Sequence, residues 1–235
     1  VSSWPESLFV AKFDSSGIFK WLSKSEGLTG NSGTRGTAVH SPGDEHIYFS
    51  GFTNGQNMSF GGINLTSESM NTKGFYGKLD PEGNFLSAGL LAGEGEERYF
   101  LNDIAADNDG NLYLAGKHTI HTKPDPVTFS EYRDIMYFCK IGNDGKIAWT
   151  VEDTALYEGT CITHSNDYLF VLGNRMEYRM IFNGGTTDTT SSFFYGIIDK
   201  GGNWLMGRKV TGALACDMYA DSDRILITGG LYLDH

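Results

Sequence analysis

One short pattern occurs four times along the chain and constrains its fold more than any other feature of the sequence. Each copy begins with an aromatic residue and ends in glycine, and three of the four close with Asp-x-x-Gly. The copies span residues 9–17, 75–83, 137–145 and 194–202. An Asp side chain caps such a turn, and glycine adopts the positive φ that closes it. Each copy is therefore predicted to be a strand, a tight turn and the start of a second strand.

A second strand pair recurs between these copies. In each case a short strand and a polar turn precede a more apolar strand that ends in glycine, over residues 37–51, 103–116, 161–173 and 216–229. No helical spacing of apolar residues competes with this pattern over any window of about 11 residues. Four strands that recur about every 60 residues are typical of a β-propeller blade. A β-sandwich is the other all-β architecture to consider, but it does not require the same hairpin four times.

The order of these units predicts an all-β fold, a β-propeller with four blades of four antiparallel strands in one domain over residues 1–235. Complete blades are expected at 37–91, 102–150 and 160–207. The remaining blade combines residues 8–22 with 214–229, so that the two ends of the chain close the ring as two plus two strands. Such closure leaves no open sheet edge. The alternative is a segment of a larger propeller.

Three stretches of the chain resemble a known family. FVAKFDSSGIFKW (9–21) and IAADNDGNLYLAG (104–116) closely resemble the two halves of the bacterial β-propeller repeat called SBBP. MSFGGINLTS (58–67) is similar to the connector of such repeats in surface proteins of Bacteroidetes. The resemblance covers nearly the whole chain and implies a propeller module of a secreted or cell-surface protein. The fourth copy departs from the pattern at Ile197, where the others have lysine.

The charge balance excludes several classes of partner. The chain has 18 Lys and Arg against 29 Asp and Glu, a formal net charge of −11. A nucleic-acid partner requires a basic footprint, and an anionic membrane surface also attracts basic segments. No apolar run approaches the roughly 20 residues of a membrane-spanning helix. We therefore expect neither nucleic-acid binding nor membrane insertion.

The long connectors between strands are predicted to lie on one face of the propeller. Those at 52–73, 117–134 and 174–192 are the longest, and long loops on a rigid scaffold are the usual binding surface. We predict a non-catalytic module, extracellular or on the cell surface, that binds a protein or glycan there and belongs to a larger surface complex. The residues assigned to binding are Trp4, Phe60, Glu94, Glu96, Glu97, Tyr132 and Tyr178.

Two other functions are alternatives. A carbohydrate-active enzyme would use paired carboxylates as general acid and base, and the acidic connector residues are Glu94, Glu96, Glu97, Glu152, Asp153 and Glu158. No GxSxG, HExxH or P-loop pattern supports other catalytic chemistry. The third possibility is a purely structural segment of a larger extracellular assembly.

No cofactor is expected, although four residues at matching repeat positions are weak candidates for a structural divalent cation in the central channel. They are His40, Asp107, His164 and Asp221. The competing explanation is that such an Asp caps its own turn. His118 and His121, with Asp125, form a second candidate for a metal site. It is weak because residues three apart on a strand point to opposite faces, so the two histidines are poorly placed to bind one ion.

Four further residues are assigned to packing. Trp21, Trp149 and Trp204 are expected to pack between blades, although tryptophan also stacks on sugars. Cys139 stands where the other copies have alanine or glycine, so it is expected to be a small buried apolar residue.

Overall fold

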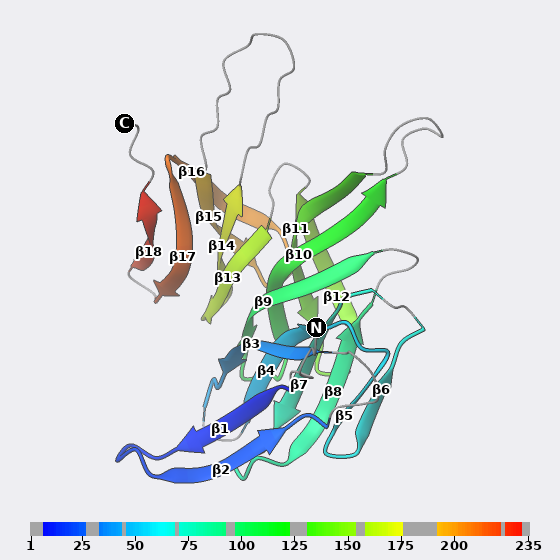
Figure 1. Cartoon of the computed structure of the whole chain (residues 1–235). Coiled ribbons are helices and arrows are strands. Elements are labelled where there is room, and N and C mark those ends of the chain that lie inside the picture. Colours follow the sequence, from blue (N-terminus) through cyan, green and yellow to red (C-terminus); the bar gives the residue numbers. More distant parts are fainter. Residues whose placement is uncertain are drawn as a thin grey trace.

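Antiparallel strands are the regular elements that the computed structural model of this chain describes (Figure 1). The structure describes residues 7–26, 33–43, 46–68, 71–92, 97–122, 131–153, 158–175, 192–221 and 224–231. Three four-stranded sheets are formed by consecutive segments of the chain. A two-stranded hairpin precedes them and another follows them. The predicted all-β class is therefore confirmed.

The three complete sheets share one topology, in which each strand pairs with its neighbour in sequence apart from one inserted hairpin. The first consists of β3 (Thr34–His40), β4 (Ile47–Thr53), β7 (Lys73–Leu79) and β8 (Phe85–Leu91). The second consists of β9 (Arg98–Ala106), β10 (Leu112–Thr122), β11 (Glu131–Ile141) and β12 (Ile147–Asp153). The third consists of β13 (Glu158–Ser165), β14 (Tyr168–Arg175), β15 (Ser192–Asp199) and β16 (Trp204–Thr211).

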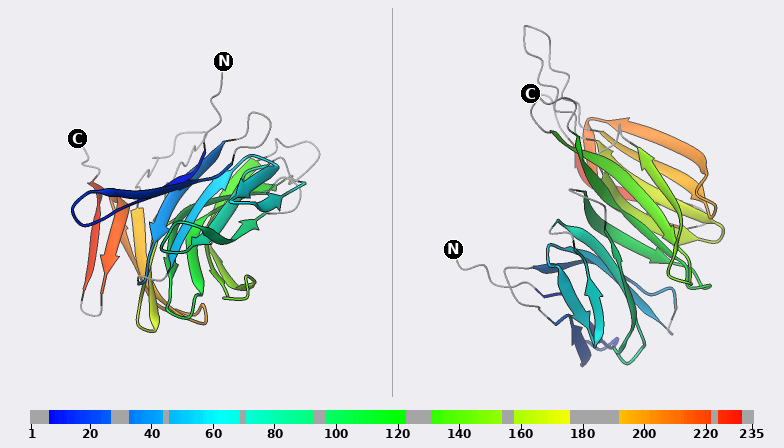
Figure 2. Two further views of the ribbon diagram at one scale, coloured as in Figure 1. Left: turned by 90° about the horizontal axis from the view of Figure 1, so that it is seen from below. Right: turned by 90° about the vertical axis from the view of Figure 1, so that its right-hand side faces the viewer.

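Three hairpins complete the fold. They are β1 (Phe9–Phe13) with β2 (Phe19–Lys24), β5 (Asn57–Phe60) with β6 (Ile63–Thr66), and β17 (Ala213–Ala220) with β18 (Ile225–Leu231). The first strands of successive sheets, β3, β9, β13 and β17, lie next to one another in that order. The sheets therefore follow each other around an arc, which Figure 2 shows from two further sides.

The turns that repeat in the sequence have the predicted geometry. The glycine that ends each copy has a positive φ, at Gly17, Gly83, Gly145 and Gly202. In three of these turns the Asp that opens the Asp-x-x-Gly sequence accepts backbone hydrogen bonds, as when the Asp14 side chain accepts from the Ile18 amide at 2.9 Å. The pKa of Asp14 lies below its usual range, chiefly because Lys20 pairs with the carboxylate.

The small-residue position of each copy is explained by the packing inside its sheet. Gly77 lies opposite Phe49, and a Cβ added to this glycine would lie 2.2 Å from the Phe49 ring. Cys139 occupies the same position in the second sheet and is fully buried, as predicted. Burial raises the pKa of the Cys139 thiol to about 12, so it stays protonated at neutral pH.

Two tryptophans hold neighbouring sheets together in the same way. The Trp21 indole donates a 2.9 Å hydrogen bond to the Pro81 carbonyl in the turn of the next sheet. The Trp149 indole donates one of the same length to Lys200, at the equivalent turn position. The predicted packing between units is confirmed for these two residues. Trp204 instead meets Phe194 of its own sheet edge-on.

The expected closure of the ring is wrong for this structure. Among the described residues β1 pairs only with β2, and β18 pairs only with β17, so residues 8–22 and 214–229 do not form one sheet. The reason is that each hairpin packs against a different sheet. Leu8 and Val10 pack with the first sheet, whereas Ala215 and Met218 pack with the third. Figure 1 shows the β1–β2 hairpin at the lower left of the molecule and the β17–β18 hairpin at the upper left.

The structure corrects the prediction that the connector at 52–73 is part of a binding surface. It folds back as the β5–β6 hairpin, and the Glu26 amide donates to the Ser59 carbonyl on it at 2.9 Å. Phe60 was expected to face a ligand. It is instead fully buried and lies 5.4–5.5 Å from the rings of Phe49, Phe75 and Phe85. Its large apolar side chain fills the core because the hairpin covers one side of the first sheet.

Candidate functional site

An aromatic and acidic group lies near the end of the second sheet, close to the long connectors. His118 on β10 is buried, and its ring stacks on Tyr99 of β9 with 4.4 Å between centroids. Tyr137 of β11 meets the Tyr99 ring edge-on at 5.3 Å. Neither ring nitrogen of His118 makes a hydrogen bond. Nε2 lies 3.6 Å from the Glu97 carboxylate, and Nδ1 lies 3.6 Å from that of Glu152.

The two phenols of this group are held in their neutral forms. Burial, with a contribution from Glu97 and Glu152, raises the pKa of Tyr99 to about 12. Burial also raises the pKa of Tyr137, which lies beside Cys139. The two carboxylates approach different nitrogens of one imidazole. General acid–base catalysis, the alternative function predicted for the acidic connectors, instead requires two carboxyl groups that face one shared substrate space.

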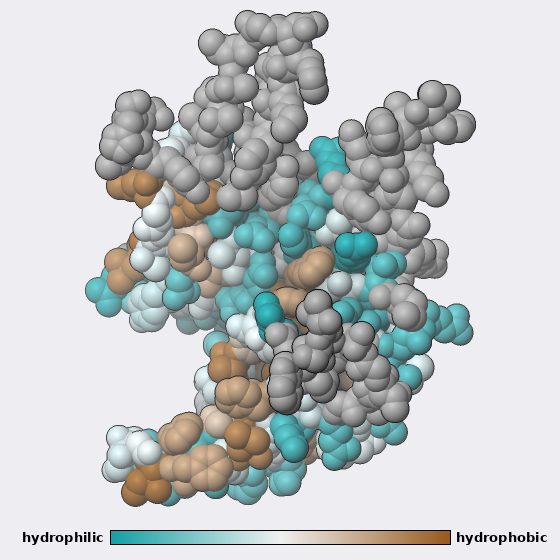
Figure 3. Space-filling view, in the orientation of Figure 1, coloured by the Kyte–Doolittle hydropathy of each residue, from teal (hydrophilic) through white to brown (hydrophobic). Residues whose placement is uncertain are grey.

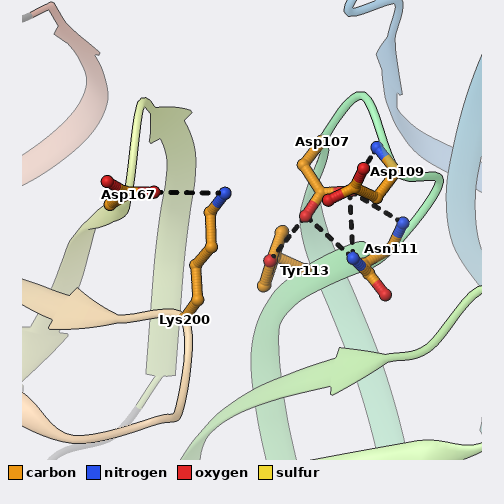
Figure 4. A network of polar contacts seen from close by, with 6 residues as sticks. All are labelled: Asp107, Asp109, Asn111, Tyr113, Asp167 and Lys200. Atoms are coloured by element: carbon orange, nitrogen blue, oxygen red, sulfur yellow. Dashed lines mark hydrogen bonds and ion pairs between the residues drawn. The ribbon is translucent and has the colours of Figure 1, made fainter.

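The four inner-strand candidates for a cation do not form a common site. Asp107 accepts hydrogen bonds from the Asn111 amide and the Tyr113 hydroxyl, both at 2.9 Å (Figure 4). Asp221 accepts from the Arg224 amide at 3.0 Å. Each of these carboxylates therefore caps its own turn. Within the described ranges, no group of three His, Cys, Asp or Glu side chains is placed to hold a metal ion.

The predicted equivalence of the two histidines is wrong because of β-bulges. The first strand of every unit carries one unpaired residue, at Thr37, Asn102, Thr160 and Cys216. His40 is the third residue after its bulge and His164 the fourth. Since side chains alternate along a strand, equal positions must be counted from the bulge. Burial lowers the pKa of His40, and the nearby His164 adds to this effect.

Side chains near these bulges join the second sheet to the third, and the third sheet to the β17–β18 hairpin. Asp103 of β9 accepts a 2.8 Å hydrogen bond from the Ile162 amide of β13. Asn174 donates to the Ala215 carbonyl at 2.8 Å and accepts from its amide at 2.9 Å, which ties β14 to β17. Burial raises the pKa of Asp103, although backbone hydrogen bonds oppose the shift. Consecutive sheets are therefore joined by specific polar contacts as well as by apolar packing.

Repeat positions that are buried in every complete sheet are exposed on β1. Phe9 is 66% exposed, whereas its counterparts Phe75, Tyr137 and Phe194 are buried. Phe13 is 58% exposed, and its counterparts are also buried; they are Leu79, Ile141 and Ile198. The space-filling view shows hydrophobic residues gathered over this hairpin (Figure 3).

The other free edges of the arc show the same contrast. Val39 on β3 is 62% exposed, and Leu226 on β18 is 54% exposed. The counterparts of Val39 in the other inner strands are Ile104, Ile162 and Met218, and those of Leu226 in the complete sheets are Tyr48, Tyr113 and Phe170; all six are buried. Apolar side chains at repeat positions that the complete sheets bury are therefore exposed on β1, β3 and β18.

Two grooves accompany these exposed residues. The β1 groove, about 1250 Å³, lies between residues 7–13 and residues 34–39 of β3, with Trp21 and Pro81 at its side. The β18 groove, about 590 Å³, lies between the β17–β18 hairpin and residues of β14 and β15. By the topology of the complete sheets, the β1 groove occupies the place of an inner strand pair. The β18 groove occupies the place of an outer pair.

Most residues that the sequence assigns to binding lie outside the described part of the chain. These are Trp4, Glu94, Glu96 and Tyr178, with the side chain of Tyr132. Of the second cation candidate, the side chain of His121 and the whole of Asp125 also lie outside it. Glu97 and Glu152 are brought together by His118, a contact that sequence reasoning did not identify. It also missed Phe9, Phe13 and Val39, because the pairing of the terminal hairpins was expected to bury them.

Neither a comparison with protein-family models nor one with curated proteins finds a match for this chain. In the part of the chain that the structure describes, no helix has the length and apolar character needed to cross a bilayer.

Proposed function

We propose that this chain is a non-catalytic β-propeller module that binds a protein through the open ends of its arc. The three complete sheets are blades, and the terminal hairpins are an outer and an inner half-blade. The observation that carries the proposal is the exposure of Phe9, Phe13, Val39 and Leu226 at positions that the complete sheets bury. An extracellular or cell-surface location follows from the resemblance to the SBBP repeat.

The chemistry of the β1 groove favours a protein over a sugar. An unpaired strand edge offers a row of backbone donors and acceptors, and among the described residues no strand pairs with β1 on its side away from β2. An added strand satisfies such an edge, while pockets for alternate side chains give specificity. Phe9 and Phe13 lie two positions either side of Ala11 on one face of β1, so they provide an apolar surface for alternating side chains.

Glycan binding on the long-loop face is the second candidate. The observation in its favour is the group of Tyr99, His118 and Tyr137 with Glu97 and Glu152, which combines aromatic rings with carboxylates near the connectors. Small-ligand sites combine apolar and aromatic walls with a few polar groups in this way. His118 and Tyr137 of this group are buried, however, and the exposed apolar surface lies elsewhere.

The test uses the full chain with two probes, a cyclic β-hairpin peptide of alternating apolar and polar residues and a glycan array. We expect the peptide to bind, a scrambled peptide of equal composition not to bind, and Phe9→Asp to weaken binding at least about tenfold. Ile147→Asp, which changes an exposed apolar residue on β12, is the matched control and should leave binding unchanged. Array binding that Phe9→Asp does not affect, without peptide binding, would replace this proposal by the glycan one.

A further inference from the structure

The internal repeats provide a template for what belongs in the two grooves. In each complete sheet a glycine of the second strand pairs with the aromatic residue that begins the repeated segment on the third strand. The pairs are Gly51 with Phe75, Gly116 with Tyr137, and Gly173 with Phe194. The same alignment pairs Gly229 of β18 with Phe9 of β1, and Ile227 with Ala11. The two free edges thus have the sequences of strands that pair.

The inner strands provide an independent match. Asp103 accepts its hydrogen bond from Ile162, and each stands at a fixed distance from the bulge of its strand. Counted from the bulges, the same two positions are Asp217 of β17 and Val39 of β3. Both residues are exposed in this structure. The Val39 amide is therefore the donor that the repeat predicts for the Asp217 carboxylate.

We propose that these complementary edges join two copies of the chain, so that the β17–β18 hairpin of each copy fills the β1 groove of the other. This rests on the proposed function and names the partner. Within one chain β17–β18 is held away from β1 by Asn174, which bonds Ala215, and by the Cys161 thiol, 3.8 Å from Asp217 and from the Met218 carbonyl. A second copy reaches the groove without breaking these contacts.

The proposed interface between copies repeats the pairing of the second strand with the third strand within each complete sheet. A β1–β2 hairpin that pairs with β18 also covers the β18 groove, where Tyr195, Ile197 and Ile227 are half-buried. Exchange in both directions gives a closed two-fold dimer in which both pairs of grooves are filled. Phe9, Phe13, Val39 and Leu226 then become buried, as their counterparts are. No free sheet edge remains at the ends of the arc.

Single-cysteine variants distinguish pairing between copies from pairing within a chain. Ala11→Cys and Ile227→Cys are made as separate proteins in a Cys216→Ser background, because the remaining Cys139 and Cys161 are buried. The two proteins are mixed, allowed to exchange and mildly oxidised. We expect a disulfide-linked heterodimer. The control mixes Ala11→Cys with Leu205→Cys, an exposed residue on β16 outside the proposed joint, and should give none.

Light scattering gives a second and independent readout. The native chain should have about twice its mass of 25.8 kDa, and Phe9→Asp should raise the dissociation constant at least about tenfold. A chain that stays monomeric up to about 0.1 mM overturns the proposal. So does an Ala11→Cys, Ile227→Cys double variant that closes its disulfide within one chain. A monomer that still binds the hairpin peptide would refute the second copy as partner and leave the proposed function standing.

Discussion

Two phenylalanines at the same repeat position differ only in what surrounds them, and this difference predicts their contributions to stability. Phe75 is fully buried, and its ring lies 5.5 Å from Phe60 and 6.3 Å from Phe49. Phe9 is 66% exposed. Removing a buried phenylalanine side chain loses its transfer free energy and leaves a cavity, whereas an exposed one loses little. The variants Phe75→Ala and Phe9→Ala therefore form a matched pair.

The structure predicts a large difference between them. Phe75→Ala should reduce the free energy of unfolding by about 3–5 kcal/mol, the range for large buried aromatic residues. Phe9→Ala should change it by less than about 0.5 kcal/mol when the chain is monomeric. With a urea m-value of about 2.5 kcal/mol/M, the first loss lowers the unfolding midpoint by about 1.2–2 M, and the second is near the error of the measurement.

The assay is equilibrium urea unfolding followed by tryptophan fluorescence, at a concentration where light scattering shows a single chain. Agreement between fluorescence and circular dichroism is required before the free energies are compared. Equal losses for the two variants would refute the reasoning, because Phe9 would then be buried within the isolated chain. That result would also restore closure of the ring by one chain's own hairpins.

Three further predictions follow from local geometry. Gly17→Ala should reduce the free energy of unfolding by about 1–2 kcal/mol, because the glycine has a positive φ. Gly83→Ala should reduce it further, because Gly83 also has a positive φ and an added Cβ would lie 2.6 Å from the Trp21 ring. Thermal unfolding of the two variants measures the difference. Cys216 alone of the three thiols should react with an aromatic disulfide in the native protein at pH 8, and all three should react in denaturant. Burial raises the pKa of Asp107, but hydrogen bonds lower it more, so its folded pKa lies below the unfolded one. Asp107→Asn should therefore cost about 1 kcal/mol at pH 7, and this cost should shrink as pH falls below about 4 through the folded pKa; an equal cost at pH 2 would contradict the assignment.

The candidate site was only partly predictable. Glycine and Asp-x-x-Gly turns identified the strands and their order, because these signals depend on residues a few positions apart. The approach of Glu97 and Glu152 to His118 joins the residue before β9 with strands β10 and β12, so no local spacing predicts it. The bulges likewise shifted His40 against His164 by one residue, since a bulge is a property of strand pairing.

The sequence by itself determined an all-β chain of repeated antiparallel units, the positive φ of its turn glycines and the burial of Cys139. Each of these depends on side-chain size or backbone freedom at one position. Only the tertiary structure decided that the terminal hairpins stay apart and that residues such as Phe9 are exposed. The physical reason is that pairing of the two ends depends on the combined angle at which successive sheets pack on one another. A repeat sequence that defines one unit does not specify this combined angle.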